Sequence, residues 1–253
     1  MPSAPPQIFS PVRRRLARQR MRRLQQLPDA PRYIVEDIAE DLAERLTFLR
    51  YQPRRALIVG EWTGRFAATL RQTGCTVVSA DPAPAAGEQA IDEERPLEGG
   101  PFDLVASVGT LDTVNDLPGA LVHIRRTLAP GGLMLASFPA AGSLPALRAA
   151  MLAGDGERPA PRLHPHVDVR GGAQLLQRCG FVNPVADSRP LTVRYASFER
   201  LIGDLRAQAL GCVLARPGPP LTREQWRTVQ AAFGRRAEET FEILTLTGWN
   251  TSE

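Results

Sequence analysis

The stretch Arg55-Ala-Leu-Ile-Val-Gly-Glu-Trp-Thr-Gly64 decides the fold of this chain. Its four apolar residues, 56–59, predict a buried strand, and Gly60 and Gly64 predict a tight turn that leads into a helix. A strand, a glycine turn and a helix N-terminus together direct backbone N–H groups toward a ligand. The stretch therefore predicts an α/β fold with a nucleotide-cofactor loop. Trp62 occupies the middle position, where close approach of a ligand to the backbone usually calls for glycine.

Short apolar runs alternate with helical patterns along the rest of the chain, which is typical of βαβ units and a mostly parallel sheet. We expect an Arg-rich helical segment over residues 1–50. One doubly wound domain of six or seven strands then covers residues 51–253, with a helical insertion at about 196–239 before the last strand. The expected strands are 56–59, 76–80, 104–107, 133–138, 182–186 and 240–248. The expected helices are 34–49, 66–73, 117–128, 144–152, 169–179, 197–210 and 222–239.

Positive charge is concentrated at the start of the chain. Residues 1–28 hold seven arginines and no acid, whereas the remaining residues hold 24 arginines against 27 acids. Such a start is typical of a mitochondrial transit peptide, of an arm that binds an acidic partner or nucleic acid, or of a solvated helix face. No aromatic residue alternates with these arginines to stack on bases, so nucleic acid is the least favoured partner.

Cysteine usage and hydropathy indicate the compartment. Cys75, Cys179 and Cys212 are widely spaced and odd in number, with no CxxC pair, which argues against a disulfide framework and a structural zinc site. Hydrophobic residues make up 43% of the chain, enough for a core. No apolar run approaches the ~20 residues that a membrane helix needs. We therefore expect a cytoplasmic protein without a membrane span.

Asp81 directly follows the second expected strand, about 20 residues after the first glycine of the turn. A carboxylate at this place accepts hydrogen bonds from the ribose hydroxyls of a cofactor. The structural alternative is a helix N-cap before Pro82. The preceding glycine loop favours the ribose interpretation, and a nicotinamide or an adenosyl cofactor is compatible with it.

Later motifs resemble the class I S-adenosylmethionine-dependent methyltransferases. These motifs are Phe102-Asp-Leu-Val105 and Leu128-Ala-Pro-Gly-Gly-Leu-Met-Leu135. Further segments resemble one branch, which contains the complex I assembly factor described as an arginine hydroxylase and its bacterial relatives. This branch is similar to the malonyl-carrier-protein methyltransferases of biotin synthesis. The segments are Val114-Asn-Asp-Leu-Pro118, Asp168-Val-Arg170, LLQRCGF at 175–181, Leu191-Thr-Val-Arg-Tyr195 and TFEILTLTGW at 240–249. Ile8-Phe9 and the Arg-rich run also match the branch, which argues against a cleaved transit peptide.

The resemblance implies a Rossmann-like class I methyltransferase fold, with helices on both faces of the sheet, and S-adenosylmethionine as cofactor. It also implies a protein or carrier-bound substrate, or a respiratory complex I subunit as partner. Carried over by position, it identifies the loop glycines, the ribose acid, an acidic segment at the adenine and a residue that packs under the cofactor. The cofactor-binding residues so implied are Gly60, Glu61, Gly64, Asp81, Asp92, Glu93 and Leu111. No residue is identified as a general base.

Departures from the family pattern gather around the same site. Ile58 stands where the family has an acid, Trp62 where it has the central glycine, and Asp112-Thr113 where the branch shows His-Trp. Only ten residues separate Asp81 from Asp92, whereas a crossover with its helix takes about ten to twelve by itself. We therefore expect the fold to be trimmed around the third strand, and the cofactor binding to be weakened or the ligand to differ.

Trp62 has two interpretations. Its indole either fills the space of the methionine moiety or swings outward and leaves the loop backbone usable. We favour closure, since a side chain near the turn obstructs the approach that glycine permits.

A second group of polar residues is His164-Pro-His166-Val-Asp168. Two histidines and a carboxylate are the residue types of the facial triad of non-haem iron oxygenases. The alternating spacing places all three on one side of an extended segment, which Pro165 favours. A loop of this kind is more often solvated, so we expect no metal site. Three hypotheses follow: a methyltransferase, a complex I assembly factor with or without arginine hydroxylation, and a non-catalytic binding protein of the same fold.

Overall fold

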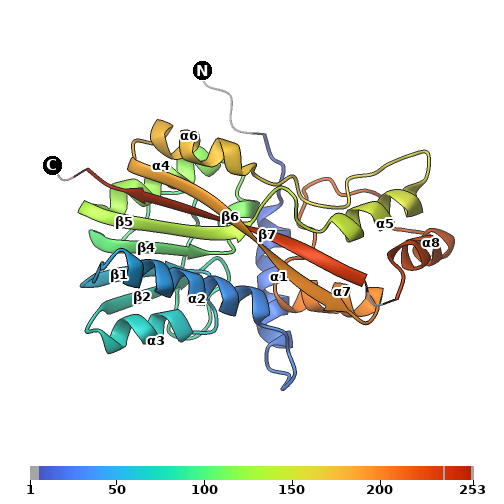
Figure 1. Ribbon diagram of the computed structural model, residues 1–253, viewed down its shortest axis with the longest axis horizontal. Helices are drawn as coiled ribbons and strands as arrows, with labels where there is room; N and C mark the ends of the chain where they lie inside the picture. Colours follow the sequence, from blue (N-terminus) through green and yellow to red (C-terminus); the bar gives the residue numbers. More distant parts are fainter. Residues whose placement is uncertain (1–5, 236, 252–253) are drawn as a thin grey trace.

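The computed structural model describes residues 6–235 and 237–251. The first five residues of the expected N-terminal segment, residue 236 in the expected helix 222–239, and the last two residues lie outside the described residues. Seven strands form one sheet in the order β3-β2-β1-β4-β5-β7-β6. Figure 1 shows β2, β1, β4 and β5 lying side by side in this order. The first five run parallel, and β7 and β6 are antiparallel to their neighbours. The strands are β1 Arg55–Val59, β2 Thr76–Asp81, β3 Gln89–Ala90, β4 Phe102–Val108, β5 Leu128–Pro139, β6 Val182–Tyr195 and β7 Ala237–Trp249.

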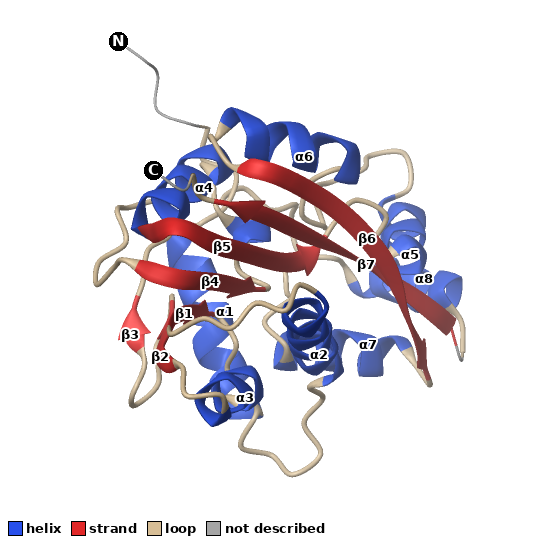
Figure 2. Cartoon of the chain, turned by 60° about the vertical axis from the view of Figure 1, so that its left-hand side comes forward, coloured by secondary structure: helices blue, strands red, loops and turns tan. Residues whose placement is uncertain are grey.

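Helices cover both faces of the sheet (Figure 2). Two hydrophobic cores result, one under α2, α3, α5, α7 and α8 and the other under α4 and α6. The helices are α1 Pro11–Leu24, α2 Tyr33–Phe48, α3 Arg65–Gln72, α4 Leu117–Thr127, α5 Pro145–Asp155, α6 Val169–Arg178, α7 Phe198–Ala207 and α8 Arg223–Phe233, with a 3-10 turn at Leu111–Thr113.

The pleat of the central strands divides their side chains between the two cores. In β1, Ala56 and Ile58 belong to the core under α2, whereas Leu57 and Val59 belong to the core under α4. Successive strand residues point to opposite faces, so a strand buried on both sides must be apolar throughout. This requirement explains why 56–59 reads as an uninterrupted apolar run.

The sheet is trimmed at its β3 edge, as the sequence predicts. β3 has only two residues, Gln89 and Ala90, which pair with Ala80 and Asp81 of β2. Between β2 and β4 the described chain contains no helix. The mostly parallel sheet with helices on both faces agrees with the predicted Rossmann-like fold class.

The β6–β7 hairpin is longer than expected. β6 runs to Tyr195 and β7 begins at Ala237, whereas we predicted an end at residue 186 and a start at 240. Pro190 argues against a strand, but β6 is an edge strand that pairs only with β7, and an edge tolerates proline. The helix expected over 222–239 ends at Phe233, because Gly234, with φ 76°, stops it.

Another correction concerns Ala129-Pro-Gly-Gly132, which lie between the expected helix over 117–128 and the expected strand over 133–138. The structure places these residues at the start of β5, which begins at Leu128. The pairing with β4 shifts register between Phe102 and Leu104, and Gly131 has a φ of 71°. A bulge of this kind accommodates a left-handed glycine inside a strand.

Helix α1 lies across the carboxyl ends of the central strands, next to α7 (Figure 1). Ser10 caps it by accepting a hydrogen bond from the Arg13 amide. Asn115 Oδ1 accepts hydrogen bonds from the Ile8 and Phe9 amides, each at 2.8 Å. Ser10 N–H donates to the Val213 carbonyl at 2.9 Å. In the described part of the chain, no helix is long and apolar enough to cross a membrane.

Candidate functional site

The glycine turn after β1 is built for the fold. Gly60, with φ 81°, donates its N–H to the Ala80 carbonyl at 2.9 Å. A Cβ on Gly60 would lie 2.3 Å from Thr110 Cγ2 and 2.5 Å from the Val108 carbonyl oxygen. Gly64, with φ 74°, is the N-cap of α3. The surrounding residues of the same chain therefore already require glycine at position 60, because no side chain fits there.

Glu61 turns into its own loop. One carboxylate oxygen accepts hydrogen bonds from the Thr63 amide, at 3.0 Å, and from the Thr63 hydroxyl. The other oxygen is buried and has no partner within the described chain. Burial raises the pKa of Glu61. The side chain therefore stabilises the turn before α3.

Trp62 packs against the core formed with α2. Together with Gly60, Ile34, Ile38 and Gln208 it lines a cavity of about 20 Å³, which is room for roughly one water molecule. This is the space beside the loop where we expected the methionine moiety to lie.

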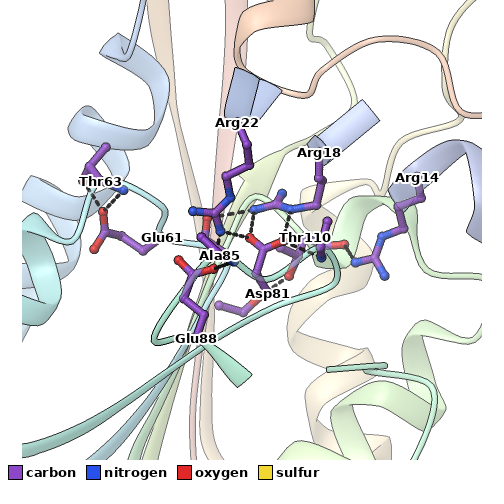
Figure 3. Close-up of polar contacts among 12 residues, drawn as sticks. Arg14, Arg18, Arg22, Glu61, Thr63, Asp81, Ala85, Glu88 and Thr110 are labelled. Atoms are coloured by element: carbon purple, nitrogen blue, oxygen red, sulfur yellow. Dashed lines mark hydrogen bonds and ion pairs between the residues drawn. The ribbon is translucent and has the colours of Figure 1, made fainter. Parts of the chain in front are cut away.

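Asp81 is fully buried at the end of β2, and two arginines of α1 hold it (Figure 3). Arg18 donates from Nε to one carboxylate oxygen at 2.8 Å and from Nη2 to the other at 2.5 Å. Arg22 Nη2 lies 3.1 Å from the carboxylate, and the Ala83 amide donates to it at 2.7 Å. Burial alone would raise the pKa of Asp81, but the Arg18 guanidinium outweighs it and the pKa is lowered. Asp81 is thus a fully engaged carboxylate.

Two further acidic residues, outside helix α1, pair with arginines of this helix. Arg14 forms a bidentate pair with Glu93, at 2.9 and 2.8 Å, and donates to the Thr110 carbonyl at 2.8 Å. Arg22 donates to Glu88. Arg14, Arg18 and Arg22 are spaced by four residues, which places them on one face of a helix. Figure 3 shows this face directed at the loops after β2 and β4.

The remaining predicted residues lie around these pairs. Leu111 is buried and packs in the core under α4. Asp92 pairs with Arg95 at 3.2 Å and lines a hollow of about 150 Å³ beside Arg14. Its neighbour Glu93 is buried, with a side chain that is 1% exposed. The two adjacent acids therefore point to different surroundings, and only Glu93 joins the contacts with α1.

Asp112-Thr113, at the positions where the resemblance implies substrate contacts, also lie beside α1. Thr113 Oγ1 accepts a hydrogen bond from Arg14 Nε at 3.1 Å. Burial raises the pKa of Asp112 to about 6, and its Oδ1 is buried without a partner in the described chain. Both residues thus lie against α1, and Thr113 also lines the hollow beside Asp92.

The His164–Asp168 segment is structural. His164 Nε2 accepts a hydrogen bond from the Val213 amide at 2.8 Å, and its ring packs edge-on against Phe9 at 5.2 Å. Asp168 caps α6 by accepting from the Arg170 amide. No cluster of three or more His, Cys, Asp or Glu able to hold a metal occurs among the residues that the structure describes. Because His164 Nε2 accepts the hydrogen bond from the Val213 amide, this nitrogen carries no proton.

Comparison with known proteins identifies the chain. A family model described as a methyltransferase domain matches residues 18–184, well over half of the chain. The chain belongs to this methyltransferase family. A malonyl-[acyl-carrier protein] O-methyltransferase of Halorhodospira halophila is 31% identical, covering 84% of this chain and 80% of that protein. The arginine-hydroxylase NDUFAF5 of Mus musculus is 26% identical, covering 86% of this chain and 70% of that protein.

Solved structures show the same fold as this methyltransferase-like protein. The YcgJ protein of Bacillus subtilis matches with a TM-score of 0.57 at 10% identity, over 85% of this chain and 99% of that chain. The 1,6-didemethyltoxoflavin-N1-methyltransferase of Burkholderia thailandensis matches with a TM-score of 0.53 at 15% identity, over 98% of this chain and 93% of that chain. These findings confirm the predicted family resemblance.

The positions that the family resemblance assigns to S-adenosylmethionine are filled here by contacts within the chain itself. The ribose acid implied by the family, Asp81, has both oxygens engaged by Arg18, and the space beside Gly60 and Trp62 holds about 20 Å³.

Sequence reasoning missed the role of Arg14, Arg18 and Arg22 in this protein. The sequence interpretation of the Arg-rich start of the chain was a transit peptide, a partner-binding arm or a solvated helix face. Three of its seven arginines instead point toward the site. A signal was present in their spacing, which places three cations on one face of an acid-free helix. The acids that receive them, Glu93, Asp81 and Glu88, lie more than sixty residues away in sequence.

Proposed function

We propose that this methyltransferase-like protein acts by binding a protein or carrier-bound partner while its own helix α1 keeps the cofactor cleft closed. One observation carries the proposal: Arg18 takes both oxygens of Asp81 in a buried bidentate pair. A cofactor ribose would need the same oxygens. The named activities of the relatives, on a malonyl-carrier protein and in arginine hydroxylation, support a protein-linked partner.

The energetics favour the closed arrangement. Arg18 offers Asp81 a bidentate pair between two full charges, whereas ribose hydroxyls offer uncharged donors and add no ion-pair attraction. Opening the cleft would also leave Arg18 without its carboxylate. Loss of one partner from a buried pair costs about 3–5 kcal/mol. Cofactor binding must exceed this cost before any affinity is measured.

Titration with S-adenosylmethionine tests the proposal. We expect no binding heat and no rise in melting temperature for the unaltered protein. A competent site at a hundredfold excess over its Kd would gain about 2.7 kcal/mol. Arg18→Ala should restore part of this gain by freeing Asp81, and Arg18→Ala with Trp62→Gly should restore more. Arg20→Ala is the matched control, because Arg20 lies on the same helix but is exposed.

Tight binding by the unaltered protein would show that the cleft opens readily, and the proposal would be wrong. Because Arg18→Ala can fail to fold, each variant is first checked by circular dichroism, and Trp62→Gly alone serves as the second route. If no folded variant binds S-adenosylmethionine, closure by α1 is not the cause of the low affinity, and the trimmed β3 edge is the cause instead.

A methyltransferase that opens its cleft is the second candidate, favoured by the presence of Gly60, Gly64 and Asp81 at their family positions. Cofactor binding that appears only when a partner is added would support it. A third candidate is a complex I assembly role, favoured by the similarity to the arginine-hydroxylase relatives. Capture of a complex I subunit, lost when residues 8–23 are deleted, would support that role. All three proposals are compatible with a reducing cytoplasm, since the three cysteines are unpaired.

A further inference from the structure

Helix α1 has a second face, opposite to the one that closes the cleft. Arg14, Arg18 and Arg22 point inward, and the helical period places Val12, Leu16, Arg20 and Arg23 on the other side. All four of these residues are exposed. We call this surface, together with Arg13, the outer face of α1. The helix thus divides its arginines between the interior of the protein and solvent.

The outer-face arginines have no acid to neutralise them. Arg13, Arg20 and Arg23 take part in no ion pair within the described chain. The sequence from residue 6 to 28 contains no Asp or Glu. Positive charge on this face is therefore open to a partner of opposite charge.

Apolar side chains lie among these arginines. Val12 is 55% exposed, Leu16 51% and, just past the helix, Leu27 57%. With Ile8, they make four of the nine large exposed hydrophobic residues described for the chain, all within its first 27 residues. Arginine and apolar residues together are the composition of a protein–protein interface, in which the apolar groups contribute area and the charges orientation.

The inner contacts hold this face in place. Three arginine pairs and the Asn115 hydrogen bonds fix both the helix and the chain that leads into it. A helix that is already ordered loses little conformational entropy when a partner binds. The outer face is thus a preorganised surface and not a flexible arm.

From these observations we infer that the outer face of α1 binds an acidic protein surface in which carboxylates surround an apolar patch. The inference rests on the proposed function, which supplies a protein-linked partner, and adds the surface of this protein that binds the partner. A membrane is disfavoured because an interfacial helix needs a broad apolar face, and here only Val12 and Leu16 lie between the arginines. Nucleic acid is disfavoured because no aromatic side chain is present on the face to stack on bases.

The test uses the full chain and, as probe, purified malonyl-acyl carrier protein, the substrate in the name of a relative. Binding is measured by calorimetry at low and high salt. We expect measurable affinity that falls as salt rises. Arg20→Glu with Arg23→Glu should weaken binding about tenfold or more. Leu16→Ser should weaken it at both salt concentrations, because the apolar contribution is not screened.

Arg223→Glu with Arg227→Glu is the matched control, since both residues are exposed on α8 and make no ion pair in the described chain. Equal loss in the two double variants would show that the attraction is general electrostatics, and would overturn the inference. Binding of phosphatidylserine vesicles or of single-stranded RNA in preference to the carrier protein would overturn it as well. No binding of the carrier protein at low salt would also overturn it. The S-adenosylmethionine titration needs no partner, so it reports separately on cleft closure.

Discussion

At Asp81, two guanidinium groups and one backbone amide share the oxygens of a carboxylate that solvent does not reach. The pair is local in space but joins residues 18 and 81, and through them the N-terminal helix and the end of β2. Each charge is tolerated in the interior only because the other is there. This single contact therefore affects both the stability of the protein and its access to a cofactor.

Removing one member of the pair should destabilise the fold. We expect Arg18→Met to lower the free energy of unfolding by about 3 kcal/mol, because Asp81 would keep only the Arg22 contact and the Ala83 amide. Urea denaturation followed by fluorescence measures the change. Arg20→Met, at an exposed position of α1, should stay within about 0.5 kcal/mol of the unaltered protein.

The double variant Arg18→Met, Asp81→Asn distinguishes pairing from packing. If the ion pair is the cause, the double loss should be clearly smaller than the sum of the two single losses. Strictly additive losses would mean that each side chain contributes through separate contacts, which would contradict our account of the site.

At the scale of elements, the way α1 begins decides how firmly it closes the cleft. Asn115 lies just before α4 and accepts hydrogen bonds from two amides of the segment leading into α1. The isolated bridge between Phe9 and Leu214 joins the same segment to the chain after α7. Two sets of contacts thus keep α1 over the cleft: the arginines along the helix and the backbone pairing of the segment before it.

Asn115→Ala should loosen α1 while leaving the sheet intact. Each lost hydrogen bond contributes about 1 kcal/mol, so amide exchange within α1 should accelerate by about tenfold or more. Hydrogen exchange followed by mass spectrometry measures this change. Peptides from β4 and β5 provide the internal control, and acceleration there to the same degree would indicate global destabilisation.

The elements also show what sequence patterns can predict. Residues 56–59 were predicted as a strand because burial on both faces leaves an uninterrupted apolar run, and Gly60 marks its end. The strand predicted over 182–186 continues to Tyr195 as β6. It passes through Pro190 because an edge strand tolerates proline, and its edge position is a property of the whole sheet. Among the site residues, the roles of Gly60 and Gly64 in the turn follow from local geometry. The pairing of Arg18 with Asp81 does not, because helical spacing says nothing about distant partners.

At the scale of the whole molecule, His164 joins three distant segments. Its ring lies against Phe9 at the N-terminal end, and its Nε2 accepts from the Val213 amide after α7. Desolvation by burial lowers the pKa of His164 to about 4, and the nearby His166 acts in the same direction. The folded protein therefore keeps His164 neutral at pH values at which His164 of the unfolded chain already begins to gain a proton.

Stability should consequently fall as the pH decreases. Below the unfolded pKa of about 6.5, the unfolded state gains a proton that the folded state does not bind, so unfolding becomes easier until the folded pKa near 4 is reached. We expect His164 to contribute a loss on the order of 2 kcal/mol at pH 5 relative to pH 7. His164→Gln keeps an acceptor for the Val213 amide but does not titrate. The difference in unfolding free energy between the two proteins, measured at both pH values, isolates the effect.

Other groups titrate in the same range, which makes this comparison necessary. Burial raises the pKa of Asp112 to about 6, so protonation of Asp112 adds stability as the pH falls below that value. His166, with a pKa also lowered to about 4, acts in the opposite direction. A difference between the unaltered protein and His164→Gln that does not change with pH would rule out a buried neutral imidazole.

The four-residue spacing of arginines on α1 has a consequence for how this sequence can diverge. Positions 14, 18 and 22 match acids at 93, 81 and 88, so a neutral or reversed charge at one position is tolerated only with a compensating change at its partner. Descendants should therefore lose or exchange Arg18 and Asp81 together. A relative that binds a cofactor ribose at the position of Asp81 should have a residue other than arginine at position 18.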